Sequence, residues 1–74
     1  MKYPLSTGEA ARLLGTTEPK LSEEVRRGRV TPEPTILAGR RLWGPKHLFQ
    51  VAENLGLLSD ELREELLREV TNAS

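Results

Sequence analysis

The chain lacks several features on which whole classes of protein depend. Among its 74 residues there is no cysteine, and histidine, tryptophan, tyrosine and phenylalanine each occur once. Without cysteine there are no disulfides, and a single histidine leaves no cluster at zinc-ligand spacing. No run of about 18 apolar residues occurs, and the first residues lack the apolar core of a signal peptide. We therefore expect one cytoplasmic domain that does not enter a membrane and holds no metal or cofactor.

The residue patterns that support catalysis are also missing. The sequence contains no phosphate-binding glycine-rich loop and no nucleophile paired with a base. The lone histidine, His47, has no carboxylate or second histidine at ligand spacing. Glu9 is better placed to cap a helix than to act as an acid catalyst. We predict that the protein is not an enzyme.

The net charge of the chain is zero, but its charged residues are unevenly distributed along the sequence. The 11 basic and 11 acidic residues cancel. Residues 20–47 hold seven basic and three acidic residues, a net charge of +4, whereas residues 48–74 hold two basic and six acidic residues, a net charge of −4. A basic segment favours an anionic partner even in a chain that is neutral overall.

Two short helices are expected near the start of the chain. Ser6 and Glu9 have the spacing of a capping box, and Gly15 ends the first helix at about residues 7–14. Thr17 is the expected N-cap of the second helix, which Gly28 ends. Only Gly15 and Thr16 separate the two helices, which is typical of a helix-turn-helix.

A β-hairpin is expected over residues 35–43. Pro32 and Pro34 exclude a helix before it, and Ala38-Gly39 suits a two-residue turn. This turn pairs Leu37 with Arg40 and Ile36 with Arg41. Successive residues of a strand point to opposite faces, so the two arginines lie on different sides and Trp43 shares the face of Arg41.

Two amphipathic helices complete the expected fold. The first starts at Pro45 and ends at Gly56, and the second starts at Ser59 and frays over residues 71–74. Leu62, Leu66, Leu67 and Val70 of the last helix either pack on the core or form a weak interface. The expected core is Leu13, Leu14, Leu21, Val25, Leu42, Trp43, Leu48, Val51 and Leu55.

The stretch "LSTGEAARLLGTTEPKLSEEVRRGRV", followed by "AGRRLWGPKHL", resembles the small MerR-like and excisionase-like DNA-binding domains over roughly residues 5–55. The resemblance implies a mainly α fold with a small β-hairpin, a winged helix-turn-helix over residues 1–58. An acidic amphipathic helix with a frayed end follows over residues 59–74. The implied function is sequence-specific binding of double-stranded DNA in the cytoplasm, at the nucleoid, as a transcriptional regulator or a recombination directionality factor.

The same resemblance assigns roles to individual residues. The second helix would enter the major groove and the hairpin, as the wing, would contact the backbone or minor groove. Guanidinium groups and helix N-termini bind phosphate, which agrees with this assignment. As ordinary hairpin charges, Arg40 and Arg41 would merely be solvated, and Arg26 and Arg27 would merely favour the helix dipole. The expected DNA-binding residues are Thr17, Pro19, Lys20, Ser22, Glu23, Arg26, Arg27, Arg40 and Arg41.

The sequence departs from the family on the second helix. Glu24 stands where the family often has an aromatic residue, and Ser22 and Glu23 stand where basic residues are common. Glu24 can instead pair with a wing arginine, with Trp43 filling the space of the missing ring. The alternative is a protein-interaction module that uses its acidic last helix. With no long coiled coil after Ser59, we expect a monomer or weak dimer that assembles on DNA through neighbouring contacts.

Overall fold

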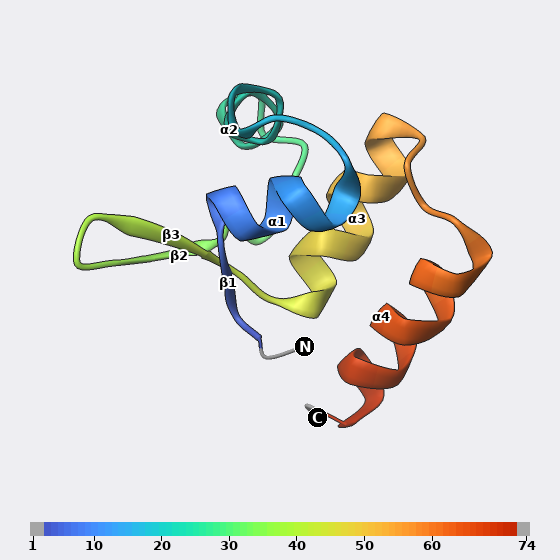
Figure 1. Ribbon diagram of the computed structural model, residues 1–74. Helices are drawn as coiled ribbons and strands as arrows, with labels where there is room; N and C mark the ends of the chain where they lie inside the picture. The colour runs from blue at the N-terminus through green and yellow to red at the C-terminus, as the bar shows by residue number, and fades with distance from the viewer. Residues whose placement is uncertain (1–2, 73–74) are drawn as a thin grey trace.

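The computed structural model of the protein describes residues 3–72. Helices α1 and α3 cross at the centre, α2 packs beside α1, and a β-hairpin and α4 lie on opposite sides of this centre (Figure 1). The fold is mainly helical, with a small three-stranded antiparallel sheet in the order β1-β3-β2. The elements are β1 (Leu5–Ser6), α1 (Thr7–Leu14), α2 (Glu18–Arg26), β2 (Thr35–Leu37), β3 (Arg40–Trp43), α3 (Pro45–Leu55) and α4 (Asp60–Asn72).

The capping residues of the first two helices confirm the boundaries expected from the sequence. The Glu9 amide donates to Ser6 Oγ at 3.2 Å, and the Ser6 amide donates to Glu9 Oε1 at 3.0 Å. Gly15 ends α1 in the left-handed conformation, with φ of 70°. Thr17 caps α2, where its hydroxyl accepts from the Lys20 amide at 3.4 Å. Because both helices are capped locally, their positions follow from short-range hydrogen bonds.

The hairpin has the register that the sequence predicts. Ile36 pairs with Arg41 and Leu37 with Arg40. Ala38 has φ of 52° and Gly39 φ of 76°, and two consecutive positive φ values are what a type I′ hairpin turn requires. This turn matches the right-handed twist of the two strands, so the strands stay paired up to the turn.

A third strand corrects the expectation of a two-stranded hairpin. Leu5 pairs with Trp43 and Ser6 with Leu42, so β1 adds to the edge of β3. A two-residue strand has no periodicity of its own to be detected in a sequence. It forms because the free edge of β3 offers unpaired backbone groups, and Ser6 serves both this strand and the cap of α1.

Trp43 lies at the centre of the core, with none of its surface exposed. Its indole Nε1 donates to Thr7 Oγ1 at 3.0 Å, so the polar atom of the ring is also satisfied. The expected core residues Leu14, Leu21, Val25, Leu48 and Val51 are buried with it, and Leu13 and Leu55 pack at its margin. Leu66, for which the sequence left packing on the core or a weak interface open, is buried in this core. The core also contains Leu5, Ala10, Ala11, Val30 and Ala52, which were not in the expected set.

Leu42 was expected in the core, and this was wrong. It is half-exposed and does not belong to the buried cluster. Leu42 precedes Trp43 on β3, and neighbouring residues of a strand face opposite ways. Once Trp43 points into the core, Leu42 must point away from it.

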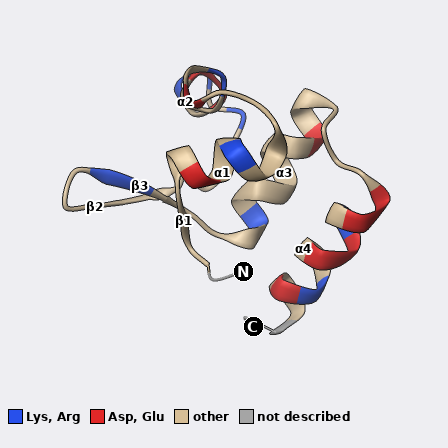
Figure 2. Cartoon of the chain, in the orientation of Figure 1, with Lys and Arg blue, Asp and Glu red and all other residues tan. Residues whose placement is uncertain are grey.

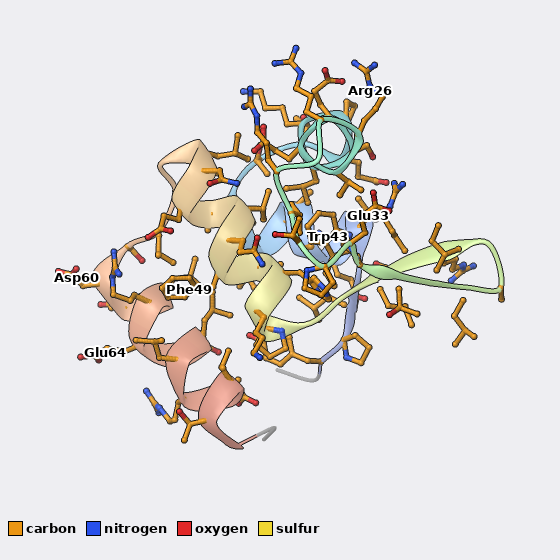
Figure 3. All side chains as sticks on the ribbon, turned by 180° about the vertical axis from the view of Figure 1, so that it is seen from behind. Arg26, Glu33, Trp43, Phe49, Asp60 and Glu64 are labelled. Atoms are coloured by element: carbon orange, nitrogen blue, oxygen red, sulfur yellow. The ribbon has the colours of Figure 1, made fainter. Side chains whose placement is uncertain are left out.

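Helix α4 packs on α3 through its apolar side. Leu66 is completely buried in the core, and Leu62 packs against it. The guanidinium of Arg63 lies 5.7 Å from the centre of the Phe49 ring of α3, a cation–π contact. In Figure 3, Asp60 and Glu64 of the same helix point outward. No helix within residues 3–72 has both the length and the apolar character that a membrane crossing requires.

The end of α4 differs from the expectation. The helix was expected to fray from Thr71, but it continues to Asn72. The Thr71 hydroxyl donates to the carbonyl of Leu67 at 2.9 Å, one turn earlier on the same helix. The expected fraying of residues 73 and 74 lies outside the described residues.

Candidate nucleic-acid interface

The amino end of α2 is exposed, as the expected site requires. Thr17, Pro19 and Lys20 all lie on the surface there. The Thr17 hydroxyl accepts from the Lys20 amide, and proline occupies a first-turn position that needs no hydrogen-bond donor. The remaining free amides of this turn point outward along the helix axis, with the positive end of the helix dipole behind them.

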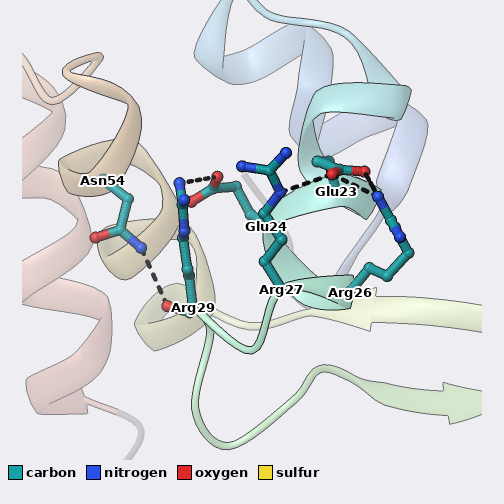
Figure 4. A network of polar contacts seen from close by, with 6 residues as sticks. All are labelled: Glu23, Glu24, Arg26, Arg27, Arg29 and Asn54. Carbon is teal, nitrogen blue, oxygen red and sulfur yellow. Dashed lines mark hydrogen bonds and ion pairs between the residues drawn. The ribbon is translucent and has the colours of Figure 1, made fainter.

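The outer face of α2 carries a cluster of three charged side chains, shown in Figure 4. Arg26 Nη2 donates to both oxygens of Glu23, at 2.6 and 2.7 Å, and its Nε donates to Oε2 at 3.1 Å. Arg27 Nε donates to Glu23 Oε1 at 2.7 Å. These hydrogen bonds, with Arg26 the stronger partner, lower the pKa of Glu23 and keep it ionised. The expected contact residues Glu23, Arg26 and Arg27 therefore bind one another.

Glu24 lies on the inner side of α2 and pairs differently from what the sequence suggested. It was expected to reach a hairpin arginine, but its Oε2 accepts from Arg29 Nη1 at 3.1 Å. Its residue surface is only 4% exposed. Gly28, with φ of 72°, turns the chain just after α2 and brings Arg29 back over the helix end. Ser22 is half-buried, so it offers less surface than the sequence implied.

The segment after α2 is fastened to α3 by two side chains that the sequence analysis missed. Asn54 Nδ2 donates to the carbonyl of Arg29 at 3.0 Å. Gln50 binds both backbone groups of Thr31, accepting at 3.0 Å and donating at 2.6 Å. Amides on an amphipathic helix normally face water, so no pattern in the sequence marks these two. Their contacts hold the carboxyl end of α2 in a defined place.

Arg40 and Arg41 lie on opposite faces of β3, as expected. Arg40 is exposed, whereas Arg41 is half-buried on the face that it shares with Trp43. The Nε of Arg41 is buried and has no hydrogen-bond partner within residues 3–72. At the tip of the hairpin, Ile36 is 60% exposed and Leu37 is 64% exposed.

A cleft of about 430 Å³ lies between the hairpin and the amino ends of α1 and α2. Glu18 of α2 approaches α1 closely: a Cβ atom added to Gly8 would lie only 3.2 Å from Glu18 Oε2. The cleft thus brings Arg40 and Arg41 beside the first turn of α2. Its lining residues are Ser6, Thr7, Gly8, Glu18, Gly39, Arg40 and Arg41. The two arginines were expected at the site from the sequence, whereas Ser6 of β1 and Thr7 and Gly8 of α1 were not.

Charge is divided between the two sides of the molecule. Basic residues occur on α2 and β3, and α4 is mostly acidic (Figure 2). Burial raises the pKa of Tyr3, and the nearby carboxylates of Glu65 and Glu69 raise it further. The acidic residues of α4 are Asp60, Glu61, Glu64, Glu65 and Glu69. The cleft and the outer face of α2 therefore lie away from the acidic helix.

His47 has a structural position at the start of α3. Its Nδ1 accepts from the Gly44 amide at 2.9 Å, and its ring meets the Trp43 ring edge to face, with 6.5 Å between centroids. Burial lowers the pKa of His47, which favours the neutral form that this hydrogen bond needs. Among the described residues, no group of three or more His, Cys, Asp or Glu side chains is arranged to hold a metal ion.

Neither a family model, nor a curated protein, nor a solved structure matches the chain.

Proposed function

We propose that this protein binds double-stranded DNA in a sequence-specific manner, with α1 and α2 as a helix-turn-helix and the hairpin as its wing. The supporting observation is the cleft that Arg40 and Arg41 line together with Glu18 of the first turn of α2. On this proposal the protein is not an enzyme and needs no cofactor. It acts on DNA in the cytoplasm, as a transcriptional regulator or a recombination directionality factor.

The two elements are suited to different tasks on a duplex. An exposed helix end can enter the major groove, where Lys20 would reach base edges. A guanidinium group on a projecting hairpin can bind a phosphate through two parallel hydrogen bonds. Such contacts position a protein on the duplex without reading its sequence. In the complex, Arg40 and Arg41 would therefore hold the duplex while the first turn of α2 reads it.

The carboxylates of α2 oppose this proposal less than the sequence suggests. Glu24 is buried and paired with Arg29, so its charge does not face a duplex. Glu23 remains on the outer face, but it is covered by two guanidinium groups. Glu23, Arg26 and Arg27 together thus give the outer face of α2 a net positive charge.

The direct test is a fluorescence-anisotropy titration of the protein with short duplexes at two salt concentrations. Replacing Arg41→Ala is expected to weaken binding to all duplexes about equally and to reduce the salt slope by about one unit. The matched control is Arg68→Ala, which removes the same charge from exposed α4 and should leave binding unchanged. A wild-type protein that binds no duplex even at low salt would refute the proposed function.

A second candidate is a protein-interaction module that uses α4. The observation in its favour is Leu67, which is 48% exposed in a groove with Glu64, Arg68 and Thr71. For such a module, the double replacement of Arg40 and Arg41 by alanine would leave partner affinity intact. Such a module would bind no duplex at any salt concentration.

The packing of α4 supports a monomer or weak dimer. Leu66 is buried within the chain and Leu62 packs against the core, so both are used internally. Leu67 remains as a small exposed apolar surface, well below the area of a stable interface. Sedimentation is expected to give a monomer or weak dimer without DNA, and neighbouring contacts would form only on a duplex. A tight dimer at micromolar concentration would contradict this.

A further inference from the structure

The outer face of α2 contains an internal competitor for DNA phosphate. We propose that Glu23 limits non-specific DNA binding by holding Arg26 and Arg27, which only a correctly placed duplex releases. This inference rests on the proposed function, since it concerns how the same surface discriminates among duplexes. It gives Glu23 a regulatory role in addition to the direct base contact expected from the sequence.

The geometry shows one carboxylate serving two guanidinium groups. Arg26 makes three hydrogen bonds to Glu23, the shortest at 2.6 Å, and Arg27 makes one at 2.7 Å. The side chain of Glu23 is 35% exposed, against 74% for Arg26 and 55% for Arg27. Both arginines therefore lie over the carboxylate and present their remaining donors to solvent (Figure 4).

A phosphate must compete with this carboxylate for the same donors. Carboxylate and phosphate both accept bidentate hydrogen bonds from guanidinium, so the two acceptors are chemically equivalent rivals. With Glu23 ionised, the three side chains carry a net charge of +1, whereas the two arginines alone would carry +2. Glu23 also places a negative charge close to any approaching backbone, which weakens contacts made in arbitrary register.

A duplex of the correct sequence can compensate for the loss of the ion pairs between Glu23 and the two arginines. In the major groove, a carboxylate accepts a hydrogen bond from the amino group of cytosine. With such a donor facing Glu23, the arginines are free to bind phosphates while the carboxylate stays satisfied. At other sequences Glu23 would be left unpaired near the backbone. The cluster therefore lowers non-specific affinity more than specific affinity.

The test compares Glu23→Gln with the wild-type protein on a mixed-sequence duplex across a salt titration. Glutamine keeps the size of the side chain but removes the charge that binds the arginines. Each released arginine adds a phosphate contact, so the salt slope should steepen by about one to two units. Affinity at about 50 mM salt should rise roughly tenfold. Circular dichroism should show an unchanged helical fold, because Glu23 lies on the surface.

Two controls separate the release of the arginines from a general change in net charge. Glu64→Gln removes the same charge from exposed α4 and should leave the salt slope unchanged. Arg26→Ala should weaken binding more strongly in the Glu23→Gln background than in the wild type, because only there is Arg26 free for phosphate. This non-additivity is specific to coupled side chains.

The inference is overturned if wild type binds the duplex and Glu23→Gln has the same slope. It is equally overturned if Glu64→Gln raises affinity as much as Glu23→Gln, since net charge would then explain the gain. A different result concerns the proposed function itself. If neither the wild type nor the Glu23→Gln variant binds any duplex at low salt, that function fails, and this inference fails with it.

Discussion

The segment from Glu23 to Arg29 and helix α4 are both rich in acidic and basic residues, yet they use them differently. Every ion pair among residues 3–72 lies between Glu23 and Arg29. Helix α4 forms no ion pair within the described part of the chain, although Glu64 and Arg68 have a spacing that favours one. Sequence spacing alone therefore does not determine which charges are paired.

The difference follows from what each helix packs against. The segment after α2 turns at Gly28 and is fastened to α3, which places Arg29 against buried Glu24. In α4, Arg63 lies over the Phe49 ring of α3 instead of reaching a carboxylate. Basic charge near α2 is thus partly compensated by ion pairs, whereas the acidic charge of α4 faces solvent.

The largest effect is expected for Trp43→Ala, which removes the largest fully buried side chain of the core. The variant should lose about 3–5 kcal/mol of unfolding free energy, because a large buried ring leaves a cavity. The lost hydrogen bond to Thr7 adds to this cost. Urea denaturation followed by circular dichroism measures it. Melting within a degree or two of wild type would show that the indole is not in the core.

The next effect separates two neighbouring leucines of α4. Leu66→Ala should cost about 2–5 kcal/mol, because Leu66 is fully buried between α4 and the core. Leu67→Ala is the matched control and should change stability by about 0.5 kcal/mol or less, because Leu67 is 48% exposed. Equal losses in thermal and urea unfolding would mean that α4 packs with a different face toward α3.

A smaller effect is expected for Lys20→Ala at the amino end of α2. If this turn reads bases, the variant should lose about 1–3 kcal/mol at a directly read base pair and change the preferred sequence. Selection of duplexes from a random pool measures the preference. Arg41→Ala should weaken binding to all of these duplexes without changing their order of affinity. An unchanged preference in Lys20→Ala would show that α2 does not read sequence through this residue.

The smallest effect is a pH dependence from His47, which lies in the first turn of α3. Burial lowers the pKa of His47 below 6.5, so the unfolded chain takes up the proton first as pH falls. Stability from this group is therefore complete above pH 6.5 and declines as pH falls through the lowered pKa. His47→Gln should remove that decline, because an amide oxygen accepts from Gly44 at any pH.

The carboxylates define a separate window that serves as the control. The cap at Ser6 lowers the pKa of Glu9, and the arginine hydrogen bonds lower that of Glu23, both from 4.5. Their stabilising effect is present above pH 4.5 and is lost as pH falls through the lowered values. The melting temperatures of wild type and His47→Gln should thus diverge as pH falls from 6.5 through the lowered pKa of His47. The further loss below pH 4.5, which comes from the carboxylates, should be the same in both proteins. Parallel curves throughout would contradict the role given to His47.

Much of the local structure could be predicted because its causes are local. The caps at Ser6 and Thr17 and the turn at Ala38-Gly39 depend on hydrogen bonds and φ values within a few residues. The hairpin register follows from the same turn, so the opposite faces of Arg40 and Arg41 could be predicted too. Residues four or fewer positions apart decide such features, and the sequence displays them directly.

The tertiary structure decided what depends on contacts between distant segments. β1 exists only because β3 provides an edge for it, and packing decided that the Trp43 face of β3 is buried and the Leu42 face is not. The partner of Glu24 depends on where Gly28 sends the chain, and the cleft depends on how closely Glu18 approaches α1. The sequence by itself determined the helices, their caps and the hairpin, because short-range hydrogen bonds and periodicity specify them. Packing decided which charges are paired, covered or exposed, because burial depends on residues that only the fold brings together.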